Sequence, residues 1–168
     1  MIRNRRNLIL VLALAIIVIG IGILLSVLKF GSSGTPTQLA DVSDRSVVSL
    51  LVGEVPIRVE VVNSSLSITQ GLSGRESIGQ DGMLFVLPQR QVISFWMKEM
   101  QFDLDLIWID NGTIVGITSD VPAPETNTPL VDLPKFNSVA AVTQVLEVPA
   151  GTAKLHNWQV GSAVQLTD

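Results

Sequence analysis

The stretch from Phe95 to Asp110, FWMKEMQFDLDLIWID, constrains the fold more than any other part of the chain. Its second half alternates with a period of two and carries apolar residues on both faces from Leu106 onward. A strand of this kind belongs in the middle of a sheet, with other elements packed against both faces. Its first half begins with a second apolar, β-prone segment, Phe95 to Met97, and the charged residues after it indicate a bend. We therefore interpret the stretch as the core strand pair of a folded domain.

The rest of the C-terminal part reads as short strands separated by turn residues. Gly53-Glu54 breaks two β-rich runs and predicts a hairpin, and Asn111-Gly112 is a stronger hairpin signal directly after the central strand. Four prolines between residues 121 and 134 predict an irregular loop. The expected strands are 47–52, 55–62, 83–87, 104–110, 113–118, 140–148 and 163–166, with short helices within 64–74 and 154–159. This pattern predicts a mainly β, jelly-roll-like β-sandwich with short helical inserts.

An uncharged apolar run from Leu8 to Leu28 precedes this domain. As a helix it would measure about 31 Å, the thickness of the hydrocarbon core of a bilayer. Three arginines before it and Lys29 after it place residues 1–7 in the cytoplasm as a basic tip. We expect a transmembrane anchor at 8–28, a flexible linker at 29–45 and an extracytoplasmic domain at 46–168. The alternative is a cleaved secretory signal, with Ser32-Ser33-Gly34 as its processing site.

The predicted domain is acidic. From residue 46 onward, six basic residues stand against thirteen acidic ones, a net charge of −7. Such a surface does not suit nucleic acid, and it would be repelled by anionic lipids, so that the helix alone would attach the chain to the membrane. The sequence has no cysteine, which excludes disulfides and thiolate metal sites.

Lys98 is the first candidate for a functional residue. It stands between Met97 and Met100 and, by alternation, shares a face with Trp96. A lysine in apolar surroundings can bind an anion or act as a base, although a lysine lying over a tryptophan ring is a structural alternative. Arg75 and Glu76 could face it across a groove, or could form a surface ion pair.

Acidic residues near the central hairpin are the second group of candidates. Asp105 and Glu125 could serve as acid or base beside Lys98, or could be ordinary polar positions of a strand and a loop. Trp108, with Trp96, could stack against a sugar ring. His156 is the only histidine, and no nucleophile, P-loop or zinc motif is present. We therefore expect neither a metal site nor a cofactor.

Several ordered blocks resemble the domain of unknown function 192 family. They are GLSGRES (71–77), GMLFVLP (82–88), FWMKEMQFDLDLIWID (95–110), VPAPE (121–125) and VLEVPAG (145–151), followed by Gly161. The resemblance implies a compact β-sandwich, close to a jelly roll and often exported or lipid-anchored in bacteria and archaea. It implies no activity. Where family members tend to have a hydroxyl residue and a proline, this chain has Glu99 and Gln101-Phe102-Asp103.

Three functional hypotheses follow. The first is a membrane-anchored, extracytoplasmic module that binds an envelope saccharide, a peptide or another envelope protein. The second is an enzyme of undetected class that uses Lys98 with Asp105 or Glu125, which requires these side chains to converge in one pocket. The third is a structural partner of another membrane protein, which predicts a flat apolar patch without a pocket.

Overall fold

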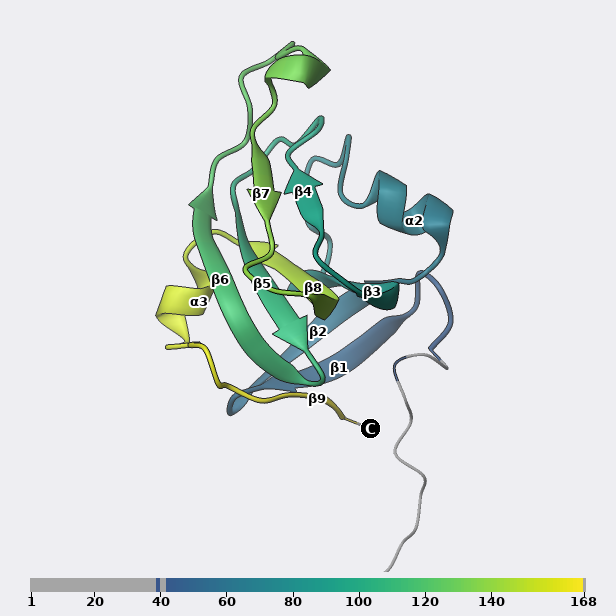
Figure 1. Ribbon diagram of the computed structural model, residues 1–168, viewed down its shortest axis with the longest axis vertical. Coiled ribbons are helices and arrows are strands. Elements are labelled where there is room, and N and C mark those ends of the chain that lie inside the picture. Colours follow the sequence, from purple (N-terminus) through teal and green to yellow (C-terminus); the bar gives the residue numbers. More distant parts are fainter. Residues whose placement is uncertain (1–38, 40–41, 168) are drawn as a thin grey trace, which may run out of the picture. The chain divides into compact units, whose positions relative to one another are not determined.

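The fold is carried by one curled sheet of seven strands (Figure 1). The computed structural model describes residue 39 and residues 42–167. The predicted basic tip, the predicted anchor and most of the predicted linker lie outside these residues. Within the described part of the chain, no helix is both long and apolar enough to cross a membrane.

The strand order of the large sheet places the predicted central strand, β5, second from one end, between β6 and β8 and not at the middle of the sheet, which is β3. Across the sheet, the strands are β6 (Thr113–Val121), β5 (Leu104–Asp110), β8 (Val142–Pro149), β3 (Gly82–Gln91), β2 (Val55–Val62), β1 (Val47–Val52) and β9 (Val164–Thr167). Neighbours are antiparallel except β2 and β3, which are parallel. A parallel pair needs a crossover, and this one contains helix α2 (Ser65–Gln70).

The two ends of the large sheet meet. The backbone N–H of Val164 donates to the carbonyl of Gly112 at 2.8 Å, and that of Ile114 donates to the carbonyl of Ser162 at 2.9 Å. These bonds join the start of β6 to the start of β9. The mainly β class is confirmed, but the architecture differs from the expected two-sheet sandwich because one sheet curls until its own edges pair.

A second, two-stranded sheet consists of β4 (Ser94–Trp96) and β7 (Lys135–Asn137). The prediction that Phe95 to Met97 forms a strand pair with the central strand is wrong, since β5 pairs with β6 and β8 and β4 pairs with β7. The two segments meet through their side chains instead. Phe95 packs edge-on against Phe85 at 4.9 Å and against Trp108 at 5.8 Å between ring centroids.

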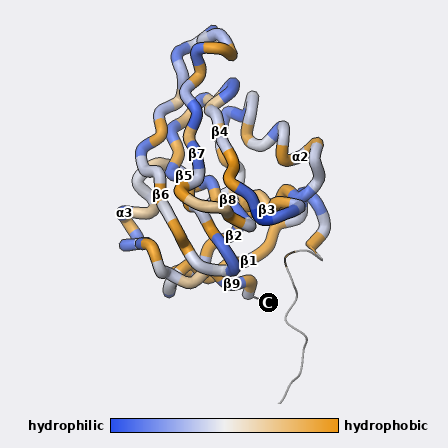
Figure 2. Tube along the Cα trace, in the orientation of Figure 1, coloured by the Kyte–Doolittle hydropathy of each residue, from blue (hydrophilic) through white to orange (hydrophobic). Residues whose placement is uncertain are grey.

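The strand β5 is buried on both faces, as its sequence predicts. Ile107 and Ile109 belong to a core inside the curl of the sheet, whereas Leu106 and Trp108 belong to a second core. This second core lies between the outer face of the sheet, the small β4–β7 sheet and the segment that follows α2. Figure 2 shows the alternation of hydrophobic and hydrophilic residues along the strands.

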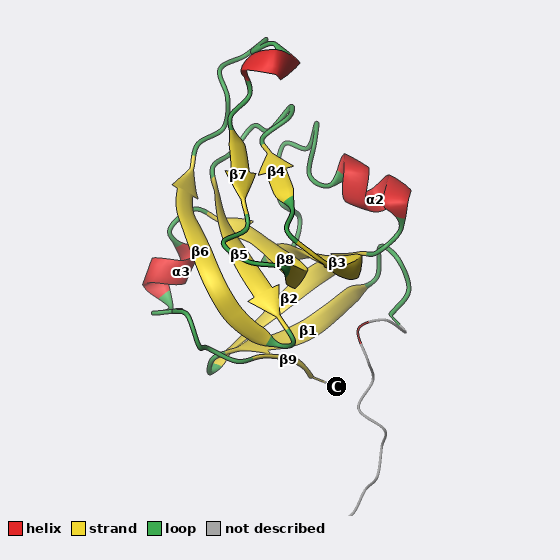
Figure 3. Ribbon diagram, viewed as in Figure 1, coloured by secondary structure: helices red, strands yellow, loops and turns green. Residues whose placement is uncertain are grey.

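Local sequence signals set the turns and helices (Figure 3). The hairpins at Gly53-Glu54 and Asn111-Gly112 are both present, and the positive φ angles of Asn111 (47°) and Gly112 (73°) suit the tight turn. The loop after β6 is irregular apart from a short 3₁₀ helix, η2 (Leu130–Asp132). Helix α3 (Thr152–Leu155) begins before the expected range of 154–159.

Candidate functional site

Two of the candidate residues, Asp105 and Trp108, take part in the fold. Both side chains are fully buried. One oxygen of Asp105 accepts from the backbone N–H of Asp120 at 2.9 Å and of Gly151 at 3.2 Å, and the other accepts from that of Ala153 at 2.9 Å. Trp108 donates from Nε1 to Thr118 Oγ1 at 2.9 Å. Neither side chain can reach a ligand without unfolding of the surrounding core.

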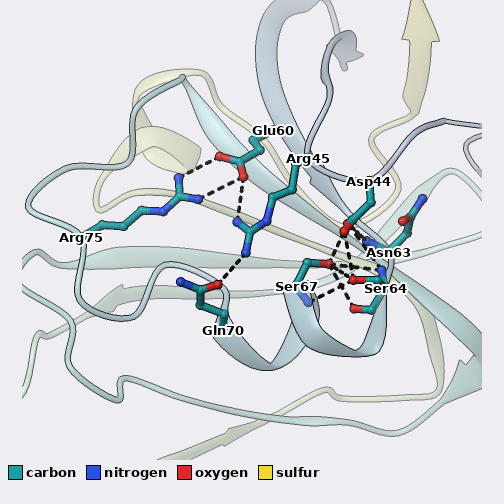
Figure 4. Close-up of polar contacts among 8 residues, drawn as sticks. All are labelled: Asp44, Arg45, Glu60, Asn63, Ser64, Ser67, Gln70 and Arg75. Atoms are coloured by element: carbon teal, nitrogen blue, oxygen red, sulfur yellow. Dashed lines mark hydrogen bonds and ion pairs between the residues drawn. The ribbon is translucent and has the colours of Figure 1, made fainter.

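The Arg75 side chain does not line the cleft of Lys98 and belongs to an ion network with Glu60 and Arg45 (Figure 4). Its guanidinium donates to both carboxyl oxygens of Glu60, at 2.7 and 3.0 Å, and Arg45 donates to the same carboxyl at 2.8 Å. The pKa of Glu60 is lowered, mainly by the hydrogen bond that it accepts from Arg75. Glu76 points into solvent and does not pair with Arg75 in the part of the chain that the structure describes.

Lys98 and Glu125 line one cleft of about 1110 Å³. The cleft lies between the turn after β4 and the Pro-rich loop after β6. Lys98 Nζ lies 3.6 Å from Glu99 Oε1, but no ion pair joins it to Glu125 among the described residues. Of the carboxyls considered as its partner, the structure thus brings Glu125 into the same cleft and leaves Asp105 inside the core.

Trp96 lies in a second, smaller cavity of about 260 Å³. Strand β4 forms one wall of this cavity, and the end of α2 with the residues after it forms the other. Trp96 is 45 % exposed at this wall. The remaining lining combines apolar and aromatic side chains with the polar residues Thr69, Gln70, Ser73 and Ser94; the apolar ones are Ile68, Leu72, Phe85, Ile93, Phe95 and Met100.

Glu147 of β8 lines the same cavity and is its only titratable residue among those described. It lies on the outer face of the large sheet, in register with Met83 of β3 and Leu106 of β5, and only 5 % of it is exposed. No hydrogen bond or ion pair to its side chain occurs within residues 42–167. Burial alone raises the pKa of Glu147 to about 8, so that the carboxyl is mostly protonated at neutral pH.

Sequence reasoning missed Glu147. The signal was present in QVLEVP, where a single acid interrupts an apolar strand with Val145 on its own face and Leu146 and Val148 on the other. An acid at such a position is uncommon, because burying an unpaired carboxyl costs free energy that the fold does not recover.

The comparisons with known proteins agree with this architecture. A family model described as "Uncharacterized ACR" matches residues 48–166. The chain belongs to this family, the domain of unknown function 192 (DUF192) family. No curated protein matches the chain.

Two solved structures resemble the DUF192 fold of this chain. One is a protein of Sinorhizobium meliloti 1021 described as a "putative transcription regulator", with 26 % identity, a TM-score of 0.64, and coverage of 74 % of this chain and 97 % of that one. The other is a protein of unknown function of Novosphingobium aromaticivorans DSM 12444, with 22 % identity, a TM-score of 0.61, and coverage of 79 % and 99 %. The second likeness concerns the fold alone.

Proposed function

We propose that this DUF192 domain is a binding module whose ligand occupies the cavity between Trp96 and Glu147, the Trp96–Glu147 pocket. The observation that carries the proposal is Glu147, a 5 % exposed acid whose carboxyl faces this cavity and has no polar partner among residues 42–167. A buried polar group without a partner is costly, and a ligand that hydrogen-bonds to it would recover that cost. Trp96 offers a partly exposed aromatic surface beside it.

The anchor predicted at residues 8–28 extends the proposal to the whole chain. It would hold the binding domain outside the cell membrane, with the N-terminus in the cytoplasm, at the end of a short linker. An envelope saccharide, a peptide or another envelope protein would then be within reach of the Trp96–Glu147 pocket.

The enzymatic alternative has weaker support. It needs a carboxyl within hydrogen-bonding reach of Lys98. Among the described residues, Lys98 forms an ion pair with the adjacent Glu99, with 3.6 Å between Nζ and Oε1. Glu125 lines the same cleft without pairing to Lys98. A role in transcription, as the description of the S. meliloti protein suggests for that protein, would require this acidic domain to approach an acidic nucleic acid.

Two small probes of equal shape test the proposed pocket. The full-length chain, in a neutral detergent, is titrated with n-butylammonium and separately with 1-butanol, while the methyl NMR signal of Met100 is followed. We expect saturable shifts with at least one probe, which weaken when Trp96→Ala removes the exposed wall. Leu155→Ala, an exposed apolar position on α3, is the control and should bind as the unchanged chain does. Absence of saturable binding by both probes would refute the pocket.

A further inference from the structure

The outer edge of β4 lies along the Trp96–Glu147 pocket. Strand β7 occupies one side of β4, and α2 lies on the other (Figure 3). Ser138 of the segment after β7 donates its backbone N–H to the carbonyl of Ile93 at 2.9 Å, which identifies Ile93 as facing β7. Backbone groups alternate in direction along an antiparallel strand, so Phe95 also faces β7 and pairs with Phe136.

The same alternation directs the backbone N–H and C=O groups of Ser94 and Trp96 toward the opposite edge. Both residues are exposed and both line the pocket. No hydrogen bond from the described residues across the pocket reaches these backbone groups. An exposed edge of this kind can accept an added strand, whose main chain supplies affinity while pockets for its side chains supply specificity.

The size and lining of the pocket favour one long side chain. Its volume of about 260 Å³ is just below the ~300 Å³ at which small-molecule sites usually begin. Apolar walls suit the methylene stem of a lysine or arginine, and the aromatic rings and the Glu147 carboxyl suit the cationic end. The net charge of −7 from residue 46 onward also attracts a basic partner.

We propose that the ligand is an extended peptide segment that pairs with the outer edge of β4 and inserts a lysine or arginine side chain toward Glu147. This inference rests on the proposed function and narrows it to a basic peptide. On binding, Glu147 releases its proton to solvent and holds the cation as a carboxylate beside the aromatic walls, while Ser94 and Trp96 bind the peptide main chain.

The first test concerns the side chain. The probe is acetyl-Ala-Val-Lys-Val-Ala-amide, compared with the same peptide carrying norleucine in place of lysine, by isothermal titration of the full-length chain. We expect the lysine peptide to bind at least about tenfold more tightly, a difference of ~1.4 kcal/mol. Glu147→Gln should abolish this preference, while Glu99→Gln, which removes one negative charge outside the pocket, should retain it. Equal binding of both peptides by the unchanged chain would overturn the cationic specificity.

The second test concerns strand addition. Single N-methyl groups are placed at successive residues of the lysine peptide, because N-methylation removes one main-chain donor without changing the side chain. Alternating residues of an added strand face β4, so we expect large losses of affinity at every second position and small losses between them. A uniform profile, or a peptide no tighter than n-butylammonium, would overturn strand pairing while leaving the pocket itself intact. If n-butylammonium and 1-butanol both fail to bind, the proposed function fails as well.

Discussion

At the scale of single residues, Asp105 and Glu147 show that similar carboxyl groups can have opposite roles in one sheet. Both belong to strands of the buried centre, β5 and β8. Asp105 accepts three backbone N–H groups and joins the end of β6 and the start of α3 to β5. Glu147 receives no hydrogen bond within residues 42–167 and faces a cavity. The first carboxyl stabilises the fold, and the second is retained at a cost in stability, which favours a functional reason for it.

Replacing Asp105 by asparagine should destabilise the domain strongly. The asparagine amide can present only one acceptor atom, so at least one buried backbone N–H loses its partner, at a cost of about 1–3 kcal/mol per group. We expect a loss of about 3 kcal/mol in the free energy of unfolding, measured by urea denaturation. Asp132→Asn, at an exposed position on η2, is the matched control and should change stability by less than about 0.5 kcal/mol. If both variants unfold alike, Asp105 does not have the structural role assigned to it.

Glu147 should make the domain less stable as the pH rises. Its pKa is about 8 in the folded protein against an ordinary value of 4.5, so between these values the unfolded chain releases a proton that the folded chain keeps. Stability should therefore fall from pH 5 to pH 8, by at most about 1.4 kcal/mol per pH unit. Glu147→Gln should lose this dependence and be more stable than the unchanged chain at pH 8. Urea midpoints that change with pH equally in both proteins would contradict this assignment.

The acid side of the stability profile has a different origin. The pKa of Glu60 is lowered, first by its hydrogen bond from Arg75, and that of Asp44 is lowered to about 2, first by its hydrogen bond from Ser67. A carboxyl whose pKa is lower in the folded protein than in the unfolded chain stabilises the fold at any pH above its unfolded-state pKa. This contribution is lost as the pH falls through its folded-state pKa. The stabilities of Glu147→Gln and of the unchanged chain should therefore be compared at pH 5 and above.

At the scale of elements, α2 depends on its first residues. Ser64 accepts the backbone N–H of Ser67 at 3.1 Å, and the Ser67 hydroxyl accepts the backbone N–H of Ser64 at 3.1 Å, which forms a reciprocal cap. We expect Ser64→Ala to cost about 1 kcal/mol and to speed amide hydrogen exchange throughout the helix. Ser65→Ala, at the exposed next position, is the control. If the two variants exchange at the same rate, the cap does not hold the helix.

How much of the site could be predicted depends on how local its signals are. The hairpin at Asn111-Gly112 and the short helix within residues 64–74 have signals that lie within a few residues, and the sequence predicts both. The pairing of β4 with β7 joins three-residue strands about 40 positions apart, and nothing in either segment specifies the partner. Trp96 was recognised as a candidate, but its neighbour Glu147 comes from a different strand of a different sheet, so their convergence was not visible in the sequence.

At the scale of the whole molecule, the contacts of the folded domain begin before the start of β1. Residues 42–45, which the composition places in the flexible linker, are bound to the domain. Arg45 donates its backbone N–H to the carbonyl of Val61 at 2.8 Å, and Asn63 donates from its side chain to the carbonyl of Val42 at 2.7 Å. Asp44 accepts from Ser64 and Ser67 at the cap of α2 (Figure 4). Residues 42–45 therefore contact the start of α2, the helix whose other end lines the proposed pocket.

Two shortened proteins test whether this attachment belongs to the domain. One begins at Leu39 and the other at Ser46, so that only the second lacks Asp44, Arg45 and their bonds to Glu60, Ser64 and Ser67. We expect both to fold, and the protein that begins at Ser46 to have the lower Tm and faster hydrogen exchange in α2. The Arg75–Glu60 pair remains in both and keeps β2 joined to the segment after α2. Equal Tm values and equal exchange in α2 would mean that residues 42–45 behave as part of the predicted linker and do not stabilise α2 or the wall of the pocket.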